Sequence, residues 1–461
     1  MKRVIALSAL ALACNSAFGE NLDGFRFWGY GKGGTGSTND QILNRQSDNA
    51  NNGMNIIQTA GNNSAMTGRL GNEGTFAELH LDYGVSKNGM NWIIKTNIAS
   101  DAEDFNLDEW WVVGRGVIPS NPEAAIWAGQ RYYQRYKSEL IDYHMVMNDG
   151  VGAGIDDLDL GFAKLNVGYT KEGNGSVTGQ DFCTNTNEQT WECEGEPGFR
   201  GNYHAISTRL HGISLADNIA MDVFANYGFY YGSDSDLEYE WSWGDVEKSA
   251  SFHQPNSYTL GFAIRQGQWA DFNQFILRYG RNTSTSMTQD WLYLPTDSVG
   301  WVFQGMQNLT DTFRIEYAWT GEYQSFNEEA RQRRINSVAW EKTLWNSFVL
   351  RNSYNWSDRW STQLELGYDM MKFDDVNEGS DPGTNTSWKA TIAQNLHLGG
   401  DFWDRPVIRF FATYGELDTK TTVYNDIPTA NESWEWRTNP YVSQTGKRTA
   451  LTVGAQFEAW W

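Results

Sequence analysis

The 461-residue sequence has little cysteine, proline or histidine, and it lacks a long hydrophobic run after its N-terminus. It contains 3 Cys, 9 Pro and 6 His. Because no run of 18 apolar residues follows the first twenty positions, a helical membrane protein is excluded. The 46 Gly follow no triplet period, and 22 Trp, 22 Tyr and 23 Phe are too many aromatic residues for a collagen-like or disordered chain.

Positive charge is also scarce. The 35 Lys and Arg are outnumbered by 57 Asp and Glu, which gives a formal net charge of −22. A nucleic-acid-binding protein needs clustered basic residues to contact phosphates, so that class is excluded. The six His are scattered, and neither a second Cys pair nor an H-E-x-x-H motif is present, so we expect no metal site and no cofactor.

The first nineteen residues have the layout of a secretory signal peptide. Lys2 and Arg3 precede an apolar stretch at 4–13, and the small residues Ala17 and Gly19 mark a cleavage site. Cys14 would be a lipid-modified cysteine in a lipoprotein, but Ala11 stands where such signals usually carry Leu. We therefore expect residues 1–19 to be removed and residues 20–461 to form a single domain.

Two cysteines remain after cleavage. Cys183 and Cys193 lie in a polar stretch containing Gly and Asn, which is typical of a loop. In an exported chain such a pair favours a local disulfide, the alternative being two free thiols.

The clearest pattern in the chain is an alternation with a period of two. In residues 75–83 one face carries Thr75, Ala77, Leu79, Leu81 and Tyr83, and the other carries Phe76, Glu78, His80 and Asp82. Residues 313–319, 364–370 and 451–461 repeat the pattern. Such segments are strands with one apolar and one polar face.

The apolar face would point inward in a soluble sandwich and toward lipid in an outer-membrane barrel. Three features favour the barrel: aromatic residues near the ends of the apolar faces, charges of both signs on the polar faces, and the terminal aromatic Trp461. About 18 antiparallel strands fit the length, at roughly 25 residues per strand and connection. The Asn- and Gly-rich stretches 37–66 and 171–202, and the tract 415–447, are predicted to be loops.

Several ordered strings resemble the maltoporin family of outer-membrane sugar channels. They are RLGNE at 69–73 followed by FAEL at 76–79, IWAGQRYYQR at 126–135, GAG at 152–154, FWDRPVIRFFATY at 402–414 and the final WW at 460–461. The resemblance implies homotrimers of 18-stranded barrels in the bacterial outer membrane, with long extracellular loops and an inward-folded constriction loop. It also implies facilitated diffusion of maltose and maltodextrins.

The family carries a track of aromatic residues along the channel, on which the C–H faces of a sugar ring can pack. The motifs place this track at Tyr30, Phe76, Phe272, Trp403 and Trp460. Alternation independently puts Phe76 on the polar face with Glu78, and Trp460 with Glu458, while Trp461 points to lipid. In the family, the outermost aromatic comes from a neighbouring subunit, and Phe105, Trp110 and Trp111 are equally open alternatives here.

Ionic residues opposite the track would bind the sugar hydroxyls through charge-assisted hydrogen bonds. By resemblance these are Lys32, Arg69, Glu78, Arg135 and Asp142, with His144 at a position where the family has Tyr. Lys32 replaces an Arg, and it keeps the charge without the planar two-pronged geometry.

Further departures are Glu139 and Lys137, which replace a His and an Asp, and Asp108, which aligns near a family Arg. We therefore hypothesise that the preference among sugars, and a pH dependence through His144, differ from the family norm.

Three other functions compete with this interpretation. A glycan-cleaving enzyme needs two carboxylates, but any chain with 57 acidic residues offers such a pair, and the lipid-facing pattern argues against an enzyme. The string Gly29-x-Gly31-x-x-Gly34 matches a dinucleotide fingerprint, yet no helix pattern follows it. A general diffusion porin has no use for aromatic residues on its wet face. We therefore predict a sugar-selective porin, with another oligosaccharide or a sucrose-like sugar as the alternative cargo.

Overall fold

The computed structural model describes residues 23–38, 57, 59–61, 67–100, 105–171, 182–183, 197–198, 203–230, 236–243, 246–253, 255–268, 270–288, 295–328, 330, 340–376, 382–420 and 445–461. Residues 1–19, the expected signal peptide, and Cys193, one half of the expected disulfide, lie outside these ranges. Among the described residues, no helix is long and apolar enough to cross a membrane.

One sheet contains most of these residues. Its eighteen strands are β1 (Gly24–Thr38), β2 (Phe76–Lys87), β3 (Met90–Ser100), β4 (Phe105–Arg115), β5 (Ala125–Arg131), β8 (Gly150–Asp159), β9 (Lys164–Lys171), β12 (Tyr203–Ala216), β13 (Ile219–Tyr230), β16 (Ser257–Gln268), β17 (Asp271–Arg281), β18 (Asp297–Asn308), β19 (Phe313–Ser325), β20 (Trp340–Asn355), β21 (Trp360–Val376), β22 (Gly383–His397), β23 (Val407–Thr419) and β24 (Gly446–Trp460). Three short hairpins accompany it: β6 (Tyr136–Ser138) with β7 (Tyr143–Val146), β10 (Phe182–Cys183) with β11 (Pro197–Gly198), and β14 (Asp236–Trp243) with β15 (Val246–His253).

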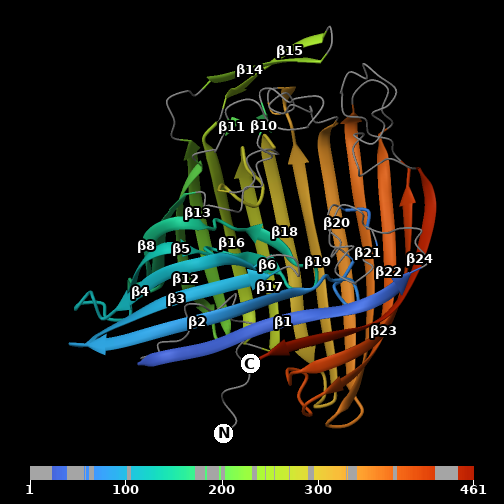
Figure 1. Ribbon diagram of the computed structural model, residues 1–461, viewed down its shortest axis with the longest axis horizontal. Helices are drawn as coiled ribbons and strands as arrows, with labels where there is room; N and C mark the ends of the chain where they lie inside the picture. Colours follow the sequence, from blue (N-terminus) through green and yellow to red (C-terminus); the bar gives the residue numbers. More distant parts are fainter. Residues whose placement is uncertain are drawn as a thin grey trace.

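The sheet closes on itself into a barrel (Figure 1). Each strand pairs antiparallel with its neighbours along the sequence, and β1 also pairs with β24, which places Tyr30 opposite Trp460 and Lys32 opposite Glu458. Closure leaves no strand edge unpaired, which a spanning sheet requires because lipid offers no hydrogen-bond partners. The prediction of an antiparallel barrel of about 18 strands is confirmed.

The alternation orients the two faces as expected for a membrane barrel. On β2 the polar side chains of Glu78, His80 and Asp82 are buried, whereas Leu81 and Tyr83 are exposed on the outside. The outer surface of the barrel is therefore apolar and the lumen is polar.

The connections differ sharply between the two ends of the barrel. β2 and β3 are joined by Asn88-Gly89, both with positive φ (55° and 76°), the backbone that a two-residue hairpin turn requires. At the other end, more than thirty residues separate β9 from β12. Outer-membrane barrels keep short turns on the periplasmic side, so the short-turn end faces the periplasm. The predicted loop at 415–447 is shorter than expected, because β23 continues to Thr419.

The β6–β7 hairpin, between β5 and β8, folds into the lumen instead of extending outward. Its apolar side chains pack against the inner wall in two clusters: Tyr136, Met145 and Val146 with Phe224, Ile276 and Val302, and Leu140 and Ile141 with Ala318, Trp345 and Val349. Gln304 on β18 accepts a hydrogen bond from the Glu139 amide and donates one to the Lys137 carbonyl. The expected inward-folded constriction loop is therefore present.

A second segment also folds inward, which the loop prediction for 37–66 did not anticipate. Ile57 packs with Leu417 and Ala450, and Leu70 packs with Ala393 and Phe411. The Leu70 amide donates to Glu365 Oε1 at 2.9 Å. Gly68, at φ 102°, lies so close to the Glu365 carboxylate that a side chain would collide with it. The segment before β2 is thus fitted to the wall formed by β20–β24.

Ile141 anchors the hairpin, because its side chain is 0 % exposed against the wall. Ile141→Ala removes this packing at a cost of about 2–5 kcal/mol. We expect the hairpin to leave the wall more often and the open-channel conductance in planar bilayers to rise. Ile392→Ala, on the exposed outer face, is the control and should conduct like wild type. An unchanged conductance for Ile141→Ala would contradict this role of the hairpin.

Candidate functional site

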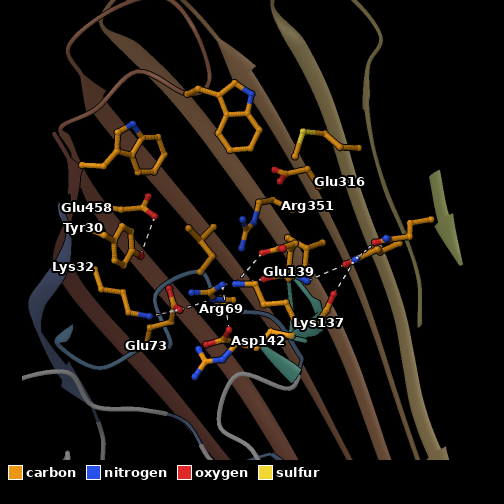
Figure 2. A pocket seen from close by; sticks show the side chains of 18 of the residues that line it. Tyr30, Lys32, Arg69, Glu73, Lys137, Glu139, Asp142, Glu316, Arg351 and Glu458 are labelled. Atoms are coloured by element: carbon orange, nitrogen blue, oxygen red, sulfur yellow. Dashed lines mark hydrogen bonds and ion pairs between the residues drawn. The ribbon is translucent and has the colours of Figure 1, made fainter. Parts of the chain in front are cut away.

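A cavity of about 700 Å³ crosses the lumen between the barrel wall and the β6–β7 hairpin. It is lined by all eleven residues predicted from the sequence: Tyr30, Phe76, Phe272, Trp403, Trp460, Lys32, Arg69, Glu78, Arg135, Asp142 and His144. Lys137 and Glu139 line it as well. Figure 2 shows side chains converging from three parts of the chain: Tyr30 and Lys32 from β1, Arg69 from the segment before β2, and Lys137, Glu139 and Asp142 from the hairpin. The structure thus brings the set together, and the role of each residue in binding stays a prediction.

Four of the five aromatic residues form two pairs. The ring centres of Tyr30 and Phe76 are 6.4 Å apart, and those of Trp403 and Trp460 are 6.5 Å apart. Strand pairing explains the arrangement, because β1 lies between β2 and β24. Phe272 comes from the first residues of β17, at the periplasmic end of the cavity.

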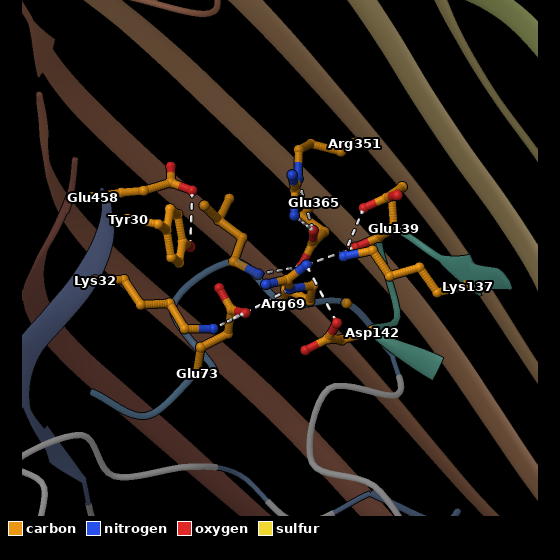
Figure 3. A network of polar contacts seen from close by, with 12 residues as sticks. Tyr30, Lys32, Arg69, Glu73, Lys137, Glu139, Asp142, Arg351, Glu365 and Glu458 are labelled. Carbon is orange, nitrogen blue, oxygen red and sulfur yellow. Dashed lines mark hydrogen bonds and ion pairs between the residues drawn. The ribbon is translucent and has the colours of Figure 1, made fainter. Parts of the chain in front are cut away.

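Arg69 is the centre of an ionic network that lines the same cavity (Figure 3). Its Nε donates to Glu73 Oε1 at 2.5 Å, and Lys32 donates to the same oxygen at 2.6 Å. Its Nη1 donates to the Glu139 carbonyl at 3.0 Å and lies 3.8 Å from Asp142 Oδ1. One guanidinium therefore joins the segment before β2 to the tip of the hairpin, which comes from a different part of the chain.

The charges of this network are fixed at neutral pH. Burial alone would raise the pKa of Glu73, but Arg69 and Lys32 hold that pKa below its ordinary value. Burial opposes ionisation of Asp142 in the same way, and Arg69 and Lys137 hold the pKa of its carboxyl well below its usual range. Both carboxylates are thus ionised and can accept hydrogen bonds from hydroxyl groups.

The two hairpin residues that depart from the family pattern pair with each other. Lys137 Nζ lies 3.3 Å from Glu139 Oε2, and both side chains reach the cavity. The pair leaves the tip of the hairpin ionic but close to neutral, and it presents both a donor and an acceptor to the lumen.

His144 lines the cavity without titrating near neutral pH. Burial, reinforced by the positive charge of Arg135, lowers the pKa of the His144 imidazole to about 3. The ring is therefore uncharged across the physiological range. Asp142 favours the protonated form, but burial and Arg135 outweigh it, so we expect no pH dependence through His144 near neutral pH.

Sequence reasoning missed a second ionic centre beside the aromatic residues. Glu458 accepts hydrogen bonds from the Tyr30 hydroxyl at 3.2 Å, from Arg405 at 2.9 Å and from Arg409 at 2.6 Å. The Arg405 guanidinium also lies 4.1 Å from the ring centre of Trp460. Alternation had placed Glu458 on the wet face, and Arg405 lies in the FWDRP string, so both signals were present in the sequence.

None of the three alternatives for the outermost aromatic lines this cavity. Trp111 is 5 % exposed and packs against the Arg131 guanidinium, 4.2 Å from its ring centre. Phe105 and Trp110 are 71 % and 63 % exposed on the outside of β4. Trp111 is therefore unsuited to contact a sugar, whereas the other two are accessible to a neighbouring subunit.

The lumen carries a different charge balance from the chain as a whole. Among the described residues that line the cavity, ten are Lys or Arg and eight are Asp or Glu. The excess of negative charge, −22 for the full sequence, is therefore located elsewhere. No group of three or more His, Cys, Asp or Glu in the described ranges is placed to hold a metal ion.

A closed 18-stranded barrel with an apolar outer face and a constricted polar lumen defines the class: a transmembrane porin of the bacterial outer membrane. The LamB porin family model matches residues 25–461, and the chain belongs to that family.

The chain is also similar, at low identity, to three solved structures. An anion-selective porin from Comamonas acidovorans shares 10 % identity with a TM-score of 0.43, over 94 % of this chain and 99 % of that one. OpdQ of Pseudomonas aeruginosa shares 8 % identity with a TM-score of 0.42, over 95 % and 100 %. The channel DcaP of Acinetobacter baumannii shares 10 % identity with a TM-score of 0.40, over 95 % and 100 %.

Because the pKa of His144 is lowered to about 3, its charge is the same at pH 5 and pH 8. We expect sugar-induced block of the ion current to differ less than about twofold between these pH values. Block constants measured in planar bilayers at both pH values, for the wild type and for His144→Gln, provide the test. A strong pH dependence that disappears in His144→Gln would show that the imidazole titrates in this range.

Proposed function

We propose that this porin is selective for sugars and passes maltose and maltodextrins by facilitated diffusion. The observation that carries the proposal is that one cavity combines aromatic rings with a paired ionic network. A pyranose has surfaces that match both, since C–H groups cover its faces and hydroxyls surround its rim. No cofactor and no covalent step enter this mechanism.

The aromatic rings let the sugar slide. Tyr30, Phe76, Trp403 and Trp460 offer flat, polarisable surfaces to the C–H faces of successive glucose units. Because the ring centres within each pair are 6.4 Å and 6.5 Å apart, a sugar can contact the second ring of a pair before it leaves the first. A row of weak, similar sites supports flow, whereas one tight site would hold the sugar.

The ionic network can exchange partners with the sugar hydroxyls. Glu73 accepts from both Lys32 and Arg69, and Arg69 also contacts the Glu139 carbonyl and Asp142. A hydroxyl both donates and accepts, so it can replace one of these contacts without leaving a charge unpaired. The near balance of charges in the lumen fits a neutral cargo.

The residues of the hairpin influence which sugar the channel prefers. Lys137, Glu139 and His144 stand where the family has other side chains, so another oligosaccharide or a sucrose-like sugar is the second candidate. Titration of maltotriose, sucrose and a β-linked oligosaccharide as blockers of the ion current decides between them. Strongest block by maltotriose is expected, and no block by any of the three would indicate a general diffusion porin.

Trp403→Ala and Trp460→Ala each remove one ring of the track. We expect maltotriose block to weaken by roughly threefold to tenfold, as the loss of one stacking contact implies. The open-channel conductance should change little, because neither ring belongs to the constriction hairpin. Trp388→Ala, on the exposed outer face of β22, is the matched control. Block equal to wild type in both channel variants would discard the assignment of the track.

We further propose that the protein is exported with removal of residues 1–19 and assembles as a homotrimer. The exposed rings of Phe105 and Trp110 on β4 support this assembly, because one of them could complete a neighbour's aromatic track. Insertion into a planar bilayer should then give three equal closing steps per insertion event. Single-step closure throughout would contradict the trimer.

A further inference from the structure

The turn at 398–406, between β22 and β23, brings two adjacent aromatic side chains to the periplasmic mouth of the channel. Phe402 and Trp403 both line the cavity, although only Trp403 was expected there. The turn is held by a hydrogen bond from Asn355 to the Gly400 carbonyl at 2.8 Å and by one from the Trp403 amide to Asp401 Oδ1 at 2.9 Å. These bonds restrain the backbone at two points, but neither fixes the direction of the two rings.

Arg314 contacts both rings from another part of the wall. Its guanidinium carbon lies 4.2 Å from the ring centre of Phe402 and 4.9 Å from that of Trp403. Arg314 belongs to β19, and two strands, β20 and β21, separate β19 from β22 in the wall. The contact therefore spans two intervening strands, and it ties the turn to β19.

The cation is more deeply buried than the two rings that it contacts. Arg314, which also lines the cavity, is 5 % exposed, whereas Phe402 and Trp403 are both partly exposed. Its Nε donates to Asn308 Oδ1 at 3.0 Å, which holds the guanidinium against the wall. Each ring thus keeps exposed surface while it contacts the cation.

We propose that Phe402 is an additional sugar-binding residue and that Arg314 is a positioning residue, which holds Phe402 and Trp403 together as a two-ring platform at the exit. The ligand of this platform, a neutral oligosaccharide, is taken from the proposed function, on which this inference rests. Cation–π stacking fixes each ring at the guanidinium plane, and a planar guanidinium can serve two rings where an ammonium serves one.

The other periplasmic rings of the track are supported in the same way. Arg405 lies 4.1 Å from the ring centre of Trp460, and Arg265 lies 4.1 Å from that of Phe272. The platform of Phe402 and Trp403 differs in that one cation serves both rings.

Current block by maltotriose, added separately on the short-turn side and on the loop side, tests the platform in the full-length protein. Phe402→Ala should weaken block by roughly threefold to tenfold and shorten the residence time of the sugar. Arg314→Gln should have a similar effect, and Arg314→Lys should recover part of it because the charge is kept. Both losses should be larger for sugar added on the short-turn side.

Matched controls separate this role from general effects. Arg359→Gln removes a positive charge from an exposed residue of the β20–β21 turn at the same end of the barrel, and Phe410→Ala removes an exposed ring from the outer face of β23. Both should be blocked like wild type. In a Phe402→Ala/Trp403→Ala background, Arg314→Gln should have no further effect, since Arg314 acts through these rings. An equal loss in that background would overturn the positioning role, and wild-type block in Phe402→Ala would overturn the binding role.

A measurement without sugar distinguishes failure of the platform from failure of the proposed function. Hydrogen exchange of the amides at 399–404 should be faster in Arg314→Gln than in wild type and unchanged in Arg359→Gln. If wild type is not blocked by maltotriose but exchange rises, the sugar assignment fails while the positioning role is confirmed. Exchange that stays at the wild-type rate would overturn the positioning role, whichever sugar the channel prefers.

Discussion

The structure depends on the need to pair every backbone hydrogen-bonding group where no water is available. In a sheet that crosses a membrane, this need is met only by closure, which here joins β1 to β24. Because the barrel is closed, successive side chains along a strand point alternately to the lipid and to the lumen. Leu81 therefore faces outward, while Glu78 and Asp82 face inward. An 18-stranded barrel encloses more space than its own side chains fill, and the additional inward segments occupy part of that space.

Those two segments are held to the wall by apolar packing and by hydrogen bonds, and they meet each other through polar contacts. Ile141 and Leu70 anchor them on different parts of the wall, and Arg69 connects them. Contacts with the wall thus keep the hairpin in place, while hydrogen-bonding pairs that can exchange partners line the cavity.

The aromatic side of the channel follows a related principle. Arg314 and Arg405 stack on the rings of Trp403 and Trp460 near the periplasmic mouth. These two side chains therefore orient the rings on which a sugar would pack. Their charge is offset within the lumen by carboxylates such as Glu458. The strongly acidic composition of the chain therefore says little about the cargo, because the surplus of acidic residues does not line the cavity.

The sequence by itself determined the fold class, since period-two alternation needs only local information, and motif strings located Tyr30, Trp403 and Trp460 on the wet face. Tertiary structure alone decided which charges meet. Alternation says that Arg314 points inward, but not that it reaches Phe402, because strand tilt and the stagger between distant strands set that contact. Likewise, Ile57 lay in the predicted loop 37–66, and its packing against Leu417 and Ala450 depends on the wall beside it. Local patterns specify which face of the barrel a residue occupies, and only closure of the barrel specifies its neighbours across the lumen.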